Sequence, residues 1–465
     1  MSKKKKETPV LAPSHFDLVV RGGHVVTSEG IVEADLGIVD GQIVRVASMI
    51  TEDASEVVEA HGRYVFPGIM DAHVHFNEPG RTDWEGIAHG SLALAAGGGT
   101  CFFDMPLNSE PPVIDAASLR TKRALAEEKS CTDFALWGGL VPGNLDRLAG
   151  LRDAGAIGLK AFMCHSGIDS FRNVDPHTLR EGMKRAAKLG LIVAVHAEDD
   201  ELAARYTAEQ KAKGRFNVRA YLASRPVEVE LAAIRQAVEF AGETGCALHV
   251  VHVSSPEGLA LITEAKAQRV DVSAETCPHY LLFNEHDVVK LGAVAKCSPV
   301  IRDERSRLAL WAELRAGDIQ TIGSDHSPSP PALKTSKDFF AIWGGIAGVQ
   351  HGFQLLFNEC GETLERDLPL LAAVLARNVA RRFRLDEHKG RLAEGFDADF
   401  TLLEVTKKKH TITANELWTQ HRLSPYVGRQ SRVRITHTYV RGQPIWSDGR
   451  IAPATRKGKF LQPQR

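Results

Sequence analysis

The stretch Phe66-Pro67-Gly68-Ile69-Met70-Asp71-Ala72-His73-Val74-His75 decides the fold, because an apolar run ends there in two histidines. Similar β-branched runs recur down the chain, separated by helical patterns rich in Ala, Leu, Glu and Arg. The eight runs begin near Phe66, Thr100, Phe134, Ile157, Leu191, Ala247, Val270 and Ile319. Strands that alternate with helices predict parallel βαβ units, and eight units predict an α/β fold closed into a (β/α)8 TIM-like barrel. An open doubly wound sheet is the alternative, but no G-x-G-x-x-G follows the first run.

Both ends of the chain have a different pattern, with apolar and polar residues alternating between turn signals. The expected short strands are 16–20, 24–27, 36–39, 43–46, 399–403, 432–437 and 438–440, with Gly22-Gly23 and Asp40-Gly41 as tight turns. We therefore expect a small β-sandwich domain formed by residues 15–66 and 390–465. The catalytic barrel then spans residues 67–389, and residues 1–14 form a disordered basic tail.

Composition narrows the class of protein. The 465 residues are 43% hydrophobic and 25% charged, with a formal net charge of -1, as in an ordinary soluble protein. This balance gives no general attraction to nucleic acid or anionic membrane, and no apolar run is long enough to span a bilayer. Seven cysteines at irregular spacing indicate reduced thiols and a cytoplasmic location.

Residues with catalytic potential stand where the apolar runs stop, which is where a barrel places its chemistry. In a strand, residues two apart face the same side, so His73 and His75 present two imidazoles to one point. Later runs end at Lys160, His196, His252 and Asp325. An isolated H-x-H is more often structural, and Asp325 alone fits a helix cap. Five separate strand ends with such residues favour a metal site. His249, which faces away from His252 in a regular strand, is interpreted as a packing or outer-shell histidine.

Lys160 is the most informative of these residues, because it lies within the apolar stretch 156–163. An unpaired ammonium is costly there, although a lysine whose charged end reaches solvent is the alternative. Reaction of the amine with carbon dioxide gives a carbamate, whose two oxygens can bridge two metal ions. A metal pair can hold a bridging hydroxide that attacks an amide carbonyl. Asp325 then acts as general base and acid, moving the proton to the departing nitrogen.

At these residues the chain resembles the cyclic amidohydrolases, which comprise dihydroorotases, hydantoinases and allantoinases. The resemblance extends over nearly the whole length, to the segment 390–399. It implies a binuclear site with His73, His75, Lys160, His196, His252 and Asp325 as ligands, Lys160 being carbamylated. Two divalent ions are expected, zinc first and Mn, Co or Fe otherwise. The family further implies a homotetramer.

Departures from the relatives suggest the branch. Dihydroorotases usually have an arginine and an asparagine that both contact the substrate carboxylate. At the matching positions this chain has Asn77 in place of the arginine and Leu107 in place of the asparagine. Hydantoinases usually place a tyrosine shortly after the lysine, and 162–167 contains none. The stretches that resemble allantoinases are 78–81, 84–86, 105–108, 223–226, 254–258, 275–280, 296–299, 324–328, 343–348 and 424–429. The resemblance thus implies opening of the neutral ureide ring of allantoin to allantoate, in purine catabolism.

The substrate contacts follow from the same resemblance. Ser298 lies in the loop whose backbone pairs with the ring amide, and Gly344 lies in the loop, residues 343–345, that closes over it. Asn77 and His165 are further expected contacts, and Cys164 and Cys277 are candidate pocket residues. Two alternatives stay open: a hydantoinase or dihydropyrimidinase acting on other neutral cyclic ureides, and a non-catalytic scaffold like the dihydropyrimidinase-related proteins. Such scaffolds lose metal ligands, whereas this sequence has the whole set.

Overall fold

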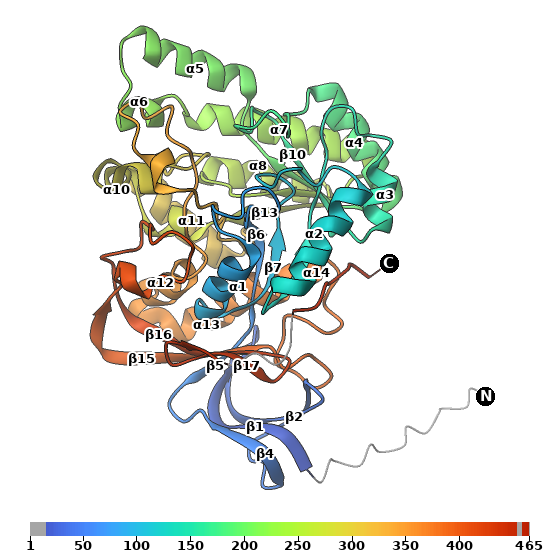
Figure 1. The fold of residues 1–465 in the computed structure, drawn as a ribbon, viewed down its shortest axis with the longest axis vertical. Coiled ribbons are helices and arrows are strands. Elements are labelled where there is room, and N and C mark those ends of the chain that lie inside the picture. The colour runs from blue at the N-terminus through green and yellow to red at the C-terminus, as the bar shows by residue number, and fades with distance from the viewer. Residues whose placement is uncertain (1–14, 453–457, 465) are drawn as a thin grey trace, which may run out of the picture.

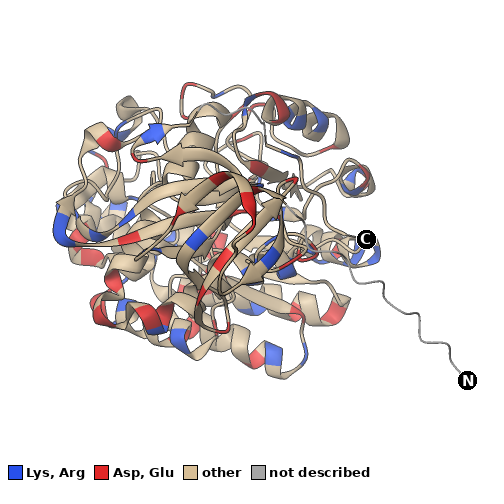
Figure 2. Cartoon of the chain, turned by 90° about the horizontal axis from the view of Figure 1, so that it is seen from below, with Lys and Arg blue, Asp and Glu red and all other residues tan. Residues whose placement is uncertain are grey.

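The protein is described from a computed structural model, which covers residues 15–452 and 458–464. The expected basic tail of residues 1–14 lies outside the described residues. A β-rich part combines strands from the N-terminal and C-terminal regions of the chain, and a larger α/β part lies above it (Figure 1). Residues 458–464 return to the α/β part, where Phe460 pairs with Phe134. No helix among the described residues is long and apolar enough to cross a membrane. Basic and acidic residues are interspersed over the face seen in Figure 2.

Eight parallel strand positions form the barrel, which confirms the predicted fold class. The strands are β6 (Ile69–Val74), β7 (Gly99–Asp104), β8 (Asp133–Leu136) with its continuation β9 (Gly138–Gly139), β10 (Leu159–Phe162), β11 (Val193–His196), β12 (Leu248–Val250), β13 (Val272–Thr276) and β14 (Thr321–Ile322). The circle closes where His326 pairs with Val74 and accepts a hydrogen bond from the His75 backbone N–H at 2.7 Å.

Alternate residues of each strand face two different apolar clusters, as a pleated barrel wall requires. Met70, Cys101 and Trp137 belong to the cluster inside the barrel, where the Trp137 indole N–H donates to the Ala72 carbonyl oxygen at 3.0 Å. Ile69 and Phe102 belong to the cluster between the strands and the helices.

Helices connect successive strands, and most of them cover the outside of the barrel. They are α1 (Ile87–Ala96), α2 (Ala116–Lys129), α3 (Leu148–Asp153), α4 (Pro176–Leu189), α5 (Asp200–Ala212), α6 (Val218–Ala223), α7 (Val227–Thr244), α8 (Pro256–Ala267), α9 (Pro278–Leu282), α10 (Glu285–Leu291), α11 (Glu304–Ala316), α12 (Gly352–Glu359), α13 (Leu364–Ala372) and α14 (Asn378–Arg382). The short 3-10 helices η1 (Gly292–Ala295), η2 (Pro331–Lys334), η3 (Gly361–Thr363) and η5 (Ala414–Glu416) and the π-helical segment η4 (Ala373–Arg377) complete them.

Strands from both ends of the chain share one sheet in the order β18-β17-β16-β15-β5-β1-β2-β3, with β4 paired to β1. They are β1 (His15–Val26), β2 (Ile31–Val39), β3 (Gln42–Ala47), β4 (Asp53–Glu59), β5 (Tyr64–Pro67), β15 (Phe400–Thr411), β16 (Gln430–Val440), β17 (Gln443–Ser447) and β18 (Arg450–Ile451). The domain limits expected near residues 66 and 390 stay a prediction.

The expected turn at Gly22-Gly23 is wrong. Strand β1 runs through both glycines, and its pairing with β2 shifts register between Val20 and Gly23. Gly22 has a φ of 65°, and a Cβ there would meet the His61 ring at 2.1 Å. The pair of glycines therefore forms a bulge that lets the chain pass close to His61. The two strands expected at 432–437 and 438–440 are likewise the single strand β16.

Candidate metal centre

A cavity of about 460 Å³ opens at the carboxyl ends of the barrel strands. Its polar lining includes His73, His75, Asn108, Cys164, His165, His196, Arg225, His252, Lys296, Ser298 and Asp325. Residues 340–345 contribute a further, largely apolar part of the wall. The size suits a small molecule, and imidazoles with a carboxylate are the donors that zinc and similar ions take.

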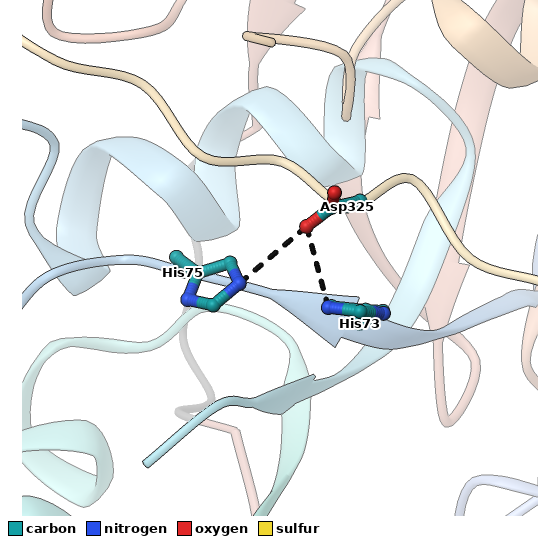
Figure 3. Close-up of side chains that lie close together, drawn as sticks. All are labelled: His73, His75 and Asp325. Atoms are coloured by element: carbon teal, nitrogen blue, oxygen red, sulfur yellow. Dashed lines mark ion pairs between the residues drawn. The ribbon is translucent and has the colours of Figure 1, made fainter. Parts of the chain in front are cut away.

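His73, His75 and Asp325 meet at one point of this cavity (Figure 3). The Asp325 carboxylate oxygen Oδ1 lies 3.3 Å from His73 Nε2 and 3.4 Å from His75 Nε2. One ligand-capable atom from each residue falls within 4.8 Å of the others, and all three side chains are largely buried. His73 lies on β6 and His75 directly after it, so both imidazoles point to the same side, and the chain after β14 brings Asp325 to them.

His196 and His252 extend the group. His196 Nδ1 lies 3.0 Å from His252 Nε2, and the rings of His252 and His73 are 5.4 Å apart between centroids. Burial lowers the pKa of His73, His196 and His252, most strongly that of His252. Their imidazoles are therefore neutral at ordinary pH, which is the form that binds a metal ion.

Lys160 on β10 is fully buried, and its amine has no hydrogen-bond partner among the described residues. Burial lowers the pKa of this amine to about 8, against the opposing attraction of Asp325 and Glu275. A buried amine without a hydrogen-bond partner needs an explanation, and its place beside the metal-ligating side-chain types at this cavity suggests one.

Two buried carboxylates hold these histidines from behind, and the sequence reasoning missed their role. Glu275 lies 2.7 Å from His73 Nδ1 and 3.4 Å from His249 Nε2, so His249 belongs to an outer shell as interpreted. Burial acts to raise the pKa of Glu275, but the attraction of His73 and the hydrogen bonds outweigh it and lower the pKa to about 2. The sequence could have indicated Glu275, because this residue lies at the end of the seventh apolar run, as the predicted site residues do at the ends of theirs.

Glu198 does the same for His196. One of its oxygens lies 2.8 Å from His196 Nε2 and accepts a hydrogen bond from the Ser298 hydroxyl at 2.5 Å. Burial raises and the charge of Arg225 lowers the pKa of this carboxyl, with a net pKa of about 2. A carboxylate hydrogen-bonded to an imidazole fixes its tautomer and orientation. Glu198 stands two residues after His196, so the same strand end supplies both.

The expected substrate contacts are only partly placed at the cavity. Ser298, Gly344, His165 and Cys164 line it. Asn77 does not, which corrects that expectation: its side chain is fully buried and donates to the Pro328 carbonyl oxygen at 3.3 Å. Its left-handed φ of 65° turns it away from the strand, and Asn108 provides the amide in the wall. Cys277 is fully buried and lies outside the cavity lining described.

Comparison with known proteins gives a consistent result. The model of the amidohydrolase family matches residues 64–445. An allantoinase of Deinococcus radiodurans is 50% identical over 97% of this chain and 99% of its own length. An allantoinase of Solibacter usitatus is 48% identical over 96% of this chain and 97% of its own. Among solved structures, an L-hydantoinase (dihydropyrimidinase) from Arthrobacter aurescens is 31% identical with a TM-score of 0.93, covering 96% of this chain and 100% of that one.

Proposed function

This chain belongs to the amidohydrolase family, and from that premise we propose that it hydrolyses the ring amide of allantoin to allantoate, in purine catabolism. It is a metal-dependent hydrolase of cyclic amides. Relatives that are allantoinases at 43–50% identity over nearly the full length support the substrate. The structural observation that carries the proposal is the meeting of His73, His75 and Asp325 beside the buried, unpartnered amine of Lys160.

We propose that two divalent ions, zinc first, bind to His73, His75, Lys160, His196, His252 and Asp325. The donor set fits this group, because it combines imidazoles with a carboxylate and a buried amine that has no hydrogen-bond partner. Lys160 would join it as the carbamate formed with carbon dioxide, and its lowered pKa leaves part of the amine neutral for that reaction. When bound, the ions polarise the carbonyl and make a water molecule acidic.

The chain's own residues then move the proton. Asp325 accepts one proton from the attacking water as the new C–O bond forms, and it donates that proton to the ring nitrogen as the C–N bond breaks. The carboxylic acid that results loses its remaining proton to solvent. Glu275 and Glu198 keep His73 and His196 oriented, and the backbone at Ser298 pairs with the amide of the ring.

The proposal also covers the cellular compartment and the oligomeric state of the protein. Seven free cysteines, none in a disulfide, support a reducing compartment such as the cytoplasm. A homotetramer is proposed from the family resemblance, and sedimentation of the purified protein measures it.

A second candidate is a hydantoinase or dihydropyrimidinase activity, favoured by the likeness to the Arthrobacter enzyme at a TM-score of 0.93. One preparation should be offered allantoin, hydantoin, dihydrouracil and dihydroorotate. We expect the highest kcat/KM with allantoin, and little turnover of dihydroorotate because Leu107 stands in the wall where an amide would contact its carboxylate. Faster turnover of hydantoin or dihydrouracil would show that allantoin is not the preferred substrate. Asp325→Asn should lower kcat by about 10²–10⁴-fold.

A further inference from the structure

One wall of the cavity is formed by residues 339–345, which we call the roof segment. It contains turns and bends but no helix or strand, and residues 340–345 all line the cavity. Irregular backbone of this kind leaves carbonyl oxygens without the partners that a helix or sheet would provide. The position of the roof segment therefore depends on what binds those oxygens.

Lys296 binds three of them. Its ammonium donates to the carbonyl oxygens of Phe339 at 2.7 Å, Phe340 at 3.1 Å and Ile342. The contact is reciprocal, because the Gly345 N–H donates to the Lys296 carbonyl oxygen at 2.7 Å. An ammonium has three N–H donors, so all three are used. The residue is only 5% exposed, and the ammonium lies 4.6 Å from the centre of the Tyr221 ring.

Lys334 binds the other end of the roof segment. Its ammonium donates to the carbonyl oxygens of Trp343 at 2.8 Å and Gly345 at 2.9 Å. Together the two lysines bind five carbonyl oxygens within seven consecutive residues. Unlike Lys296, Lys334 is not among the residues that line the cavity, so its effect on a bound substrate passes through the roof segment.

Removing the two ammonium groups from water costs free energy, which their hydrogen bonds must offset. Within residues 15–452 and 458–464, no carboxylate lies in ion-pair range of either ammonium. Burial lowers the pKa of Lys296 to about 7 and of Lys334 to about 8. Hydrogen bonds that involve a charged donor are stronger than those between neutral groups, and a buried ammonium deprived of them is destabilised. The roof segment and the lysines thus stabilise each other.

We propose that Lys296 and Lys334 are positioning residues that hold the roof segment over the cavity in the shape that binds the substrate ring. The proposal rests on the proposed function for the identity of the substrate, but its structural part does not. A roof segment released from the lysines would leave the metal ligands in place and widen the cavity. The expected consequence is weaker substrate binding with a smaller change in the chemical step.

The test uses Lys334→Met and Lys296→Met in the full chain, with Lys337→Met as the matched control. Methionine keeps the unbranched stem and removes the ammonium, and Lys337 is exposed in the same stretch. Steady-state kinetics with allantoin, metal content and hydrogen exchange of residues 339–345 without substrate should be measured. We expect KM to rise about tenfold or more in the first two variants, with faster exchange and unchanged metal content. Lys337→Met should match the unaltered protein.

Lys334→Met decides the outcome even where Lys296→Met fails to fold, because Lys334 lies outside the cavity lining. Unchanged exchange in Lys334→Met, or faster exchange with an unchanged KM, would overturn the positioning role. If the unaltered, metal-loaded protein does not open allantoin, the proposed function fails instead. The exchange measurement, which contains no substrate, still decides whether the lysines hold the roof segment.

Discussion

Lys160 is the residue on which the proposed chemistry depends most. It is fully buried without a hydrogen-bond partner, and a charge on its amine disfavours protonation of His252. A neutral amine or a carbamate fits this environment, and only the carbamate offers oxygens to a cation. The pattern was readable because a lysine within an apolar run is rare enough to demand a reason.

We predict that Lys160→Ala loses bound metal and activity, because the ligand proposed to form on this amine can no longer form. Acetate or propionate should restore part of both by occupying the space left by the side chain. Metal analysis and allantoin turnover on the same samples measure this. Lys213→Ala, an exposed lysine after α5, is the control and should behave like the unaltered protein. Full activity of Lys160→Ala without an additive would remove the bridging role.

Glu275 gives a second test at this scale. Its carboxylate contacts both His73 and His249, so Glu275→Gln keeps the shape and removes the charge that orients the metal-facing imidazole. We expect metal affinity to fall by about 10–100-fold, measured by competition with a chromophoric chelator. The exposed Glu264→Gln on α8 serves as the control. Equal affinities in both variants would mean that Glu275 does not support the site.

At the scale of elements, the strand ends were the most predictable feature. Each predicted run begins within three residues of the strand observed, because buried parallel strands show as apolar, β-branched runs. Two local details were not predictable in this way. Gly22-Gly23 has turn chemistry but forms a bulge, since tertiary contact with His61 decides its role. Asn77 lies two residues after His75, which favoured a substrate contact, but its left-handed backbone conformation turns the side chain toward Pro328.

Close approach of three strand ends leads to a prediction about Gly323, which follows β14. A Cβ at this position would meet the Cβ of His73 at 2.8 Å and the Glu275 carboxylate at 2.9 Å. Gly323→Ala should displace both and weaken metal binding by about tenfold or more. The control is Gly30→Ala, where a Cβ meets nothing within 4 Å. Metal binding that is equally tight in both variants would show that the strand ends can separate without consequence.

At the scale of the whole molecule, a buried charge cluster joins the barrel to the sheet formed by the chain ends. Lys389 contacts Asp133 of β8 at 2.6 Å, Asp397 at 2.8 Å and Asp399 at 2.6 Å, and Arg441 pairs with Asp133. Sequence patterns could not predict this cluster, because Asp133 and Arg441 are far in the chain from Lys389, Asp397 and Asp399, and each member is an ordinary charged residue by itself.

We predict that Asp133→Asn lowers the free energy of unfolding by about 3–5 kcal/mol at pH 7, because it removes a buried carboxylate charge that compensates both Lys389 and Arg441. Burial raises the pKa of Asp133, but Lys389 and Arg441 more than reverse this and lower it below 3.8. The stabilisation is therefore complete above pH 3.8 and is lost as pH falls through the lowered pKa. Denaturant unfolding at several pH values should show the difference between the two proteins shrinking in acid. The exposed Asp146→Asn is the control. A constant difference down to pH 2 would contradict the assignment.

The central claim is that a metal centre at the barrel mouth opens the ring of allantoin. The most direct measurement is allantoin turnover by metal-depleted protein as zinc is added in known equivalents, in the presence of bicarbonate. We expect negligible turnover without metal and a rise that levels off at about two ions per chain. Full turnover by the metal-depleted protein, or none at any metal content, would contradict it.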